Sequence, residues 1–79
     1  MLPVQCRMAR AALGLAIADL AKLAGVSTNT VVRFETGAEL KQSTIDALRS
    51  VFQDAGLEFI AENGGGAGVR FSKPAGTEK

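Results

Sequence analysis

The sequence predicts a mainly α fold, in which four helices form one domain and a short C-terminal β-hairpin follows it. Apolar residues recur every three or four positions in four successive segments, which glycines separate or close. After Gly56 the period changes to two, as expected for strands. A chain of 79 residues has room for one compact domain. We therefore expect a helical domain over 1–56, a hairpin over 57–72 and a disordered polar tail over 73–79.

The first two helices are indicated by their apolar spacing and by the residues at their ends. Residues 4–13 are predicted to form a helix that begins near Pro3, and residues 16–24 a second helix that stops at Gly25. Glycine suits the positive φ that commonly ends a helix. The apolar positions of the first helix are Cys6, Ala9 and Leu13.

Two polar signals mark the starts of the third and fourth helices. Ser27 is a favourable N-cap for a third helix that runs to Thr36 and stops at Gly37. The stretch Ser43-Thr44-Ile45-Asp46 has the form of a capping box, which predicts a fourth helix that ends at Gly56. The residues expected on the buried faces of these helices are Val31, Phe34, Ile45, Leu48, Val51 and Phe52.

The hairpin is indicated by alternation on both sides of a glycine-rich loop. In residues 57–62, Leu57, Phe59 and Ala61 alternate with Glu58, Ile60 and Glu62. Residues 63–68 are expected to form the loop, and residues 69–72 a second short strand. The glycine run lacks the Lys-Ser/Thr of a P-loop and the strand-to-helix context of a dinucleotide fingerprint. We interpret it as a turn rather than a nucleotide site.

Composition excludes most catalytic and metal chemistry. The chain has no histidine and one cysteine, Cys6, so it offers neither a zinc cage nor an intramolecular disulfide. Cys6 lies on the apolar face of the first helix and is interpreted as a small buried hydrophobe rather than a redox sensor. We expect no enzyme activity, no cofactor and no metal. The sequence has no apolar run of membrane-spanning length and no signal peptide, which predicts a cytoplasmic protein without membrane contact.

Charge is unevenly distributed along the chain. The net charge is +1, but residues 1–34 carry +3 and residues 35–79 carry −2. This asymmetry fits a protein that presents its first half to an anionic partner, although a fluctuation in so small a count would look the same.

The second and third helices, joined by Gly25-Val26-Ser27, have the spacing of a helix-turn-helix, whose second helix can enter the DNA major groove. Residues 5–52 resemble the helix-turn-helix family of lambdoid phage repressors and Cro, the Xre family. The motifs that carry the resemblance are Leu13-Gly14-Leu15, Asp19-Leu20-Ala21, Ala24-Gly25-Val26-Ser27 and Val31-Val32-Arg33-Phe34-Glu35-Thr36-Gly37. The resemblance implies a transcription regulator of the repressor type that binds double-stranded DNA, with recognition helix 27–36 in the major groove.

The resemblance and the side-chain chemistry together assign roles to individual residues. Predicted base contacts, on the outward face of the recognition helix, are Thr28, Asn29, Val32 and Arg33. Predicted phosphate contacts, at helix N-termini and in the following loop, are Ser27, Thr30, Thr36, Lys41 and Gln42. The family also implies a structural ion pair between Arg10 and Glu35.

The chain departs from the family at Ala16 and Ile17, where a serine or threonine followed by a glutamine is usual. The second helix is therefore expected to lack its usual cap. Without the phosphate or base contact that this glutamine usually makes, DNA binding would depend more on the recognition helix and the loop that follows it. Alternatively, Ile17 would pack against a DNA sugar or a second subunit.

The hairpin carries the apolar residues Phe59, Ile60, Val69 and Phe71, which permit two interpretations. The hairpin either covers the fourth helix or forms a dimer by strand pairing or by an apolar face; the small core favours a dimer. A homodimer would bind an inverted-repeat operator with half-site centres about 10–10.5 bp apart, or a multiple of that. The alternative is an antitoxin-like module whose C-terminal hairpin binds a partner protein, with DNA binding secondary.

Overall fold

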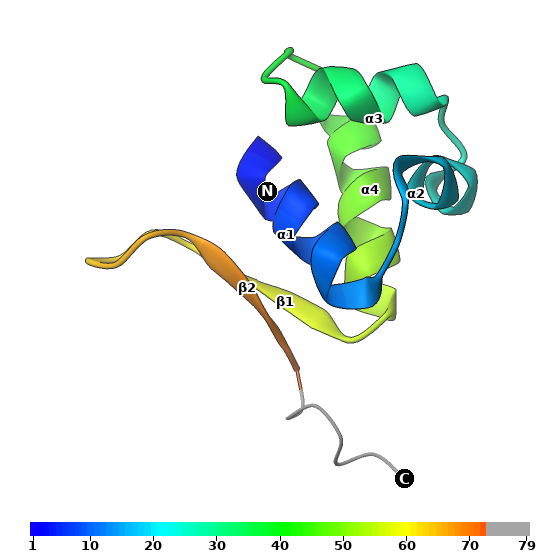
Figure 1. Cartoon of the computed structure of the whole chain (residues 1–79). Coiled ribbons are helices and arrows are strands. Elements are labelled where there is room, and N and C mark those ends of the chain that lie inside the picture. Colours follow the sequence, from blue (N-terminus) through cyan, green and yellow to red (C-terminus); the bar gives the residue numbers. More distant parts are fainter. Residues whose placement is uncertain (73–79) are drawn as a thin grey trace, which may run out of the picture.

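The computed structural model describes residues 1–72 and contains four helices followed by a two-stranded antiparallel hairpin (Figure 1). The predicted fold class is confirmed, and the tail predicted over 73–79 lies outside the described residues. The elements are α1 (Pro3–Leu13), α2 (Ile17–Ala24), α3 (Thr28–Glu35), α4 (Gln42–Asp54), β1 (Leu57–Ile60) and β2 (Gly68–Phe71). Within residues 1–72, none of the helices has the length and apolarity needed to cross a bilayer.

One core joins all four helices and the first strand. Each helix contributes apolar side chains that are withdrawn from solvent, and Leu57 of β1 is only 2% exposed in the same cluster. The Phe52 and Phe59 rings meet edge to face with their centroids 6.1 Å apart, which attaches the hairpin to α4. The buried apolar residues are Cys6, Ala9, Leu20, Ala21, Val31, Phe34, Leu48, Phe52 and Leu57.

The helix ends follow the predicted signals at two places and depart from them at a third. Gly25 closes α2 with a φ of 72°, and Ser27 caps α3 by accepting a hydrogen bond from the Thr30 N–H at 3.1 Å. The capping box predicted at Ser43 is wrong. Helix α4 begins at Gln42 because the Lys41 carbonyl already accepts helical hydrogen bonds from the fourth helix, so Ser43 lies inside the first turn.

The start of α2 is capped by a side chain within the helix, not by the side chain of the N-cap residue. Ala16 has no side-chain oxygen, but its backbone N–H donates to Asp19 Oδ2 at 2.9 Å. This bond is the reciprocal half of a capping box, and the Asp19 carboxylate also suits the positive end of the helix dipole. The expected absence of the usual cap at Ala16 is therefore partly compensated within α2.

The hairpin lies beneath the helices, with β1 against α4 and β2 against α1 (Figure 1). Its register pairs Leu57 with Phe71 and Phe59 with Val69, so these side chains share the face turned toward the helices. Buried Gln5 of α1 holds both strands at once: its Nε2 donates to the Ile60 carbonyl at 3.1 Å and to the Gly68 carbonyl at 2.9 Å.

Candidate nucleic-acid interface

Helices α2 and α3 cross closely around a three-residue turn. Ala21 is 3% exposed at the crossing, where a larger side chain would separate the helices. The Val26 N–H donates to the Ala21 carbonyl at 3.0 Å, which joins the turn to α2. On the inner face of α3, Val31 and Phe34 are buried, as their spacing predicts. The orientation of α3 is therefore determined by its own buried face.

The outer face of α3 carries the side chains predicted to read bases. All four of them are exposed, and the exposed fraction of Val32 is 41%, which is high for a large apolar residue. Among residues 1–72, the Asn29 carboxamide and the Arg33 guanidinium form no hydrogen bond with another side chain or with the backbone. The exposed set on this face is Thr28, Asn29, Val32 and Arg33.

The predicted phosphate contacts lie at the two ends of α3 and at the start of α4, and their polar groups differ in the hydrogen bonds that they already make. The Ser27 and Thr30 hydroxyls are 2.9 Å apart and bond each other. The Thr36 hydroxyl donates within its own helix, to the Val32 and Arg33 carbonyls, so its proton is already engaged. Lys41 is exposed at the N-cap of α4.

Gln42, beside Lys41, is exposed in the first turn of α4, and its Nε2 donates to Asp46 Oδ1 at 2.9 Å. One amide hydrogen of this side chain remains available for another acceptor. The geometry therefore favours Lys41 and Gln42 over Thr36 as donors to a phosphate.

Arg10 of α1 and Glu35 at the end of α3 form a bidentate ion pair. Arg10 Nε lies 2.7 Å from Glu35 Oε2, and Arg10 Nη2 donates to Glu35 Oε1 at 2.8 Å. Arg10 Nη1 also donates to the Leu15 carbonyl at 3.2 Å. A second arginine, Arg7, donates to the Glu35 carbonyl oxygen. The C-terminal end of α3 is therefore joined to α1 by two guanidinium groups.

The pKa values around this pair are displaced in the directions that a buried ion pair requires. Burial acts to raise the pKa of Glu35, but hydrogen bonds from Arg10 and from the Cys6 thiol, with the charges of Arg10 and Arg7, hold it below its usual value. Hydrogen bonding to Glu35 raises the pKa of Arg10. Burial and then the bond to Glu35 raise the pKa of Cys6 to about 12, so this thiol stays protonated and unreactive.

The four hairpin residues predicted to form a dimer contact are divided between two environments. Phe59 and Val69 are partly buried and pack against the core of their own chain. Arg49 of α4 lies over the Phe59 ring, with its guanidinium carbon 5.5 Å from the ring centroid. Ile60 is partly buried on the opposite face of the hairpin, and Phe71 is 39% exposed. The hairpin thus covers its own helices, and the dimer contact stays a prediction.

Three residues that organise this region are absent from the predicted set. Gln5 is the polar member of the buried face of α1, four positions before Ala9, and a glutamine in such a stripe indicates a buried partner. Asp19 at the third position of α2 is a recognisable capping residue. Arg7 has no comparable signal, because its partner is a backbone carbonyl 28 positions away.

Comparison with known proteins agrees with this geometry. A family model described as helix-turn-helix matches residues 7–58, which include α2, α3, α4 and all but the start of α1. The search for similar curated proteins found no match.

Proposed function

Because the chain belongs to the Cro/cI-type helix-turn-helix family, the Xre family, we propose that it is a sequence-specific transcription regulator that reads double-stranded DNA with α3. Members of this family bind DNA and are generally not enzymes. The observation that carries the proposal is the outer face of α3. This face exposes hydrogen-bonding and methyl groups, while the opposite face of the helix is buried.

Each exposed side chain of this face suits a particular base edge. The Arg33 guanidinium can donate two hydrogen bonds to O6 and N7 of a guanine, and the Asn29 carboxamide can pair with N6 and N7 of an adenine. Val32 can contact the methyl group of a thymine, and Thr28 offers a hydroxyl to either kind of base. The freedom of Asn29 and Arg33 from bonds within residues 1–72 supports these roles.

Phosphate contacts would orient α3 over the groove without reading sequence. We assign this role first to Lys41 and Gln42 at the start of α4 and to Ser27 and Thr30 at the start of α3. Thr36 would need to give up its internal bonds to donate to a phosphate.

We further propose that the regulator acts as a homodimer on an inverted-repeat operator, where its effect is repression. Two copies related by a two-fold axis would place their recognition helices in successive major grooves, about 10–10.5 bp apart or a multiple of that. Because such a regulator would bind chromosomal DNA, we expect it to be located at the nucleoid.

Selection of binding sites from a random double-stranded DNA library tests this function. We expect the wild-type chain to enrich an inverted repeat. Arg33→Ala should lose the preference at one G·C pair in each half-site, at a cost of about 1–3 kcal/mol per contact.

The matched control is Arg70→Ala, which removes an exposed arginine from the hairpin rather than from α3. This variant should enrich the wild-type repeat. Identical enriched sites from Arg33→Ala and wild type would refute the base-reading role of Arg33, and failure of the wild type to enrich any site would refute the proposed function.

A further inference from the structure

The loop that joins α3 to α4 carries two opposite charges. Residues 36–41 contain one acidic side chain, Glu39, and one basic side chain, Lys41. Both are exposed, whereas Leu40 between them is partly buried and packs against the core. Leu40 therefore anchors the loop, and a charged side chain extends into solvent on either side of it.

This loop is held in place by hydrogen bonds to the last turn of α3. The Gly37 N–H donates to the Phe34 carbonyl at 3.0 Å. The Ala38 N–H donates to the Arg33 carbonyl at 2.9 Å. Gly37 has a φ of 100°, a conformation that glycine adopts readily and that lets the chain turn away from the helix. The position of Glu39 is thus tied to that of α3.

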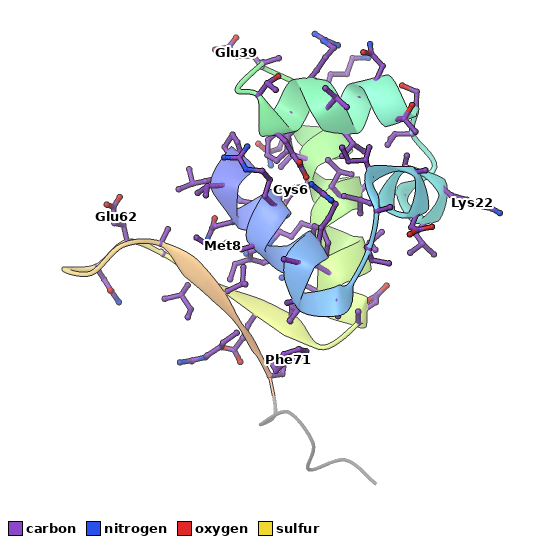
Figure 2. All side chains as sticks on the ribbon, viewed as in Figure 1. Cys6, Met8, Lys22, Glu39, Glu62 and Phe71 are labelled. Carbon is purple, nitrogen blue, oxygen red and sulfur yellow. The ribbon has the colours of Figure 1, made fainter. Side chains whose placement is uncertain are left out.

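Glu39 has no partner of its own among residues 1–72. Its carboxylate forms no ion pair there and accepts no hydrogen bond from the amides that begin α4, so it neither bridges nor caps an element. Asp46, in the next helix, differs because its Oδ1 accepts a hydrogen bond from Gln42. Figure 2 shows Glu39 pointing away from the helices, at the end of the molecule where α3 lies. The described contacts therefore give this carboxylate no structural role.

A phosphate that Lys41 binds would lie within the electrostatic range of Glu39. Residues two positions apart have Cα atoms at most about 7 Å apart, even in a fully extended chain. This separation is shorter than the Debye length, which is about 10 Å at 0.1 M salt. The phosphate is therefore attracted by one charge of the loop and repelled by the other.

We propose that Glu39 limits the affinity of this chain for DNA phosphates, a role that rests on the proposed function and adds a residue to it. Attraction between cations and phosphates supplies nearly all of the affinity for DNA of arbitrary sequence. Glu39 opposes Lys41 and so reduces this attraction, while the base contacts of α3 are unaffected. Stable binding then requires those base contacts, because residues 36–41 have no net charge with which to hold a duplex.

A hydrogen bond from a base to Glu39 is the competing role. A carboxylate only accepts hydrogen bonds, and the amino group of cytosine is the donor that acidic side chains bind in the major groove. Such a contact would give Glu39 a preference for one base pair, whereas repulsion of phosphates acts on every sequence. Position favours repulsion, because the side chains proposed to read bases lie on α3 itself and Lys41, beside Glu39, is the proposed phosphate donor.

The test compares the wild type with Glu39→Gln and Glu62→Gln in binding titrations on two labelled duplexes of equal length. One duplex carries the operator that the wild type enriches, and the other has its bases scrambled. Each substitution removes one exposed carboxylate and keeps the shape of the side chain. Glu62 follows β1 on the hairpin, far from Glu39, and is the matched control (Figure 2). Circular dichroism melting confirms that each variant is folded, and we expect equal Tm values because Glu39 has no partner to lose.

At about 0.1 M salt we expect Glu39→Gln to bind both duplexes more tightly than the wild type does, by about threefold to tenfold. The gain should be the same for both duplexes, because phosphates carry no sequence information. It should shrink as the salt concentration rises, since the Debye length falls to about 3 Å at 1 M. The slope of log K against log salt concentration should therefore be steeper for Glu39→Gln, and Glu62→Gln should match the wild type.

Three kinds of result would overturn the proposal. The first is an affinity of Glu39→Gln for both duplexes that equals or falls below that of the wild type. The second is an equal gain in Glu62→Gln, which would show that net charge alone matters. The third is a changed preference at one base pair of the operator with unchanged affinity for the scrambled duplex, which would identify Glu39 as a base contact.

The role of Glu39 and the proposed function can fail separately. If the wild type enriches an operator through Arg33 but Glu39→Gln binds both duplexes as the wild type does, only the role of Glu39 fails. If the wild type enriches no operator but Glu39→Gln binds the scrambled duplex more tightly than the wild type does, only the sequence-specific function fails.

Discussion

Arg10 and Glu35 show how one ion pair can position a recognition helix. The Arg10 side chain is 19% exposed and that of Glu35 is 6% exposed, so little water is available to replace either partner. Both oxygens of the carboxylate are bonded, and this two-point contact opposes rotation of α3 against α1. The pair acts through the orientation of α3, since Glu35 is buried whereas the side chains of the reading face are exposed.

Removal of Arg10 should therefore destabilise the fold strongly. Arg10→Ala leaves the Glu35 carboxylate without its bidentate partner and the Leu15 carbonyl without a donor, and we expect a loss of about 2–4 kcal/mol in the free energy of unfolding. Arg70→Ala breaks the exposed pair with Glu58 and should cost at most about 1 kcal/mol. Urea unfolding measures both, and equal losses would contradict the structural role of Arg10.

At the scale of an element, the hairpin depends on contacts with the helices. A two-stranded sheet is marginal in water without support from other elements. Here the support comes from Leu57 and Phe59, which pack against the core, and from Gln5, which bonds the last residue pair of the ladder on both strands. The Gln5 Oε1 also accepts a hydrogen bond from the Leu2 N–H at 2.8 Å, so this buried carboxamide has partners on both of its atoms.

Gln5→Ala should loosen the hairpin while the helices persist. The substitution leaves the Ile60 and Gly68 carbonyls without the donor that joins them to α1, at a cost of roughly 1–3 kcal/mol. Hydrogen exchange should accelerate at the amides of β1 and β2 more than at those of α2 and α3. Gln53→Ala, at an exposed position of α4, is the matched control and should leave both sets unchanged. Unchanged hydrogen exchange at the hairpin amides in Gln5→Ala would show that the Gln5 hydrogen bonds contribute little to the stability of the hairpin.

For the whole molecule, charge distribution bears on how DNA would be bound. A net charge of +1 by itself indicates no anionic partner, but the first 34 residues carry +3. Lys41 adds an exposed cation at the start of α4, near the end of the recognition helix. The hairpin exposes Arg70 on the opposite side of the molecule, where Glu58 neutralises it.

Affinity for DNA should consequently depend on salt through a small number of cations near α3. Lys41→Gln should lower the slope of log K against log salt concentration by about 1 per bound chain, and it should weaken binding to all sequences equally. Arg70→Gln, on the hairpin, should leave the slope unchanged. DNA-binding titrations at several salt concentrations measure this slope. A slope for Lys41→Gln equal to that of the wild type would show that Lys41 does not contact a phosphate.

Local signals predicted most of the secondary structure. Glycines ended α1 and α2, Ser27 capped α3, and the change of period after Gly56 marked the hairpin, because each of these effects acts over a few neighbouring residues. The prediction of a capping box at Ser43 was wrong for a related reason. The same residue types are acceptable inside a first turn, and local sequence does not determine which backbone carbonyl begins the helix.

The sequence by itself determined the four helices, the hairpin, the spacing of α2 and α3, and the face of α3 that is exposed. Each of these depends on periodicity and on residues close together in the chain. Only the tertiary structure decided that Gln5 of α1 is buried and joins both strands of the hairpin. That outcome depends on contacts between residues 55 and 63 positions apart, which a pattern read along one helix cannot predict.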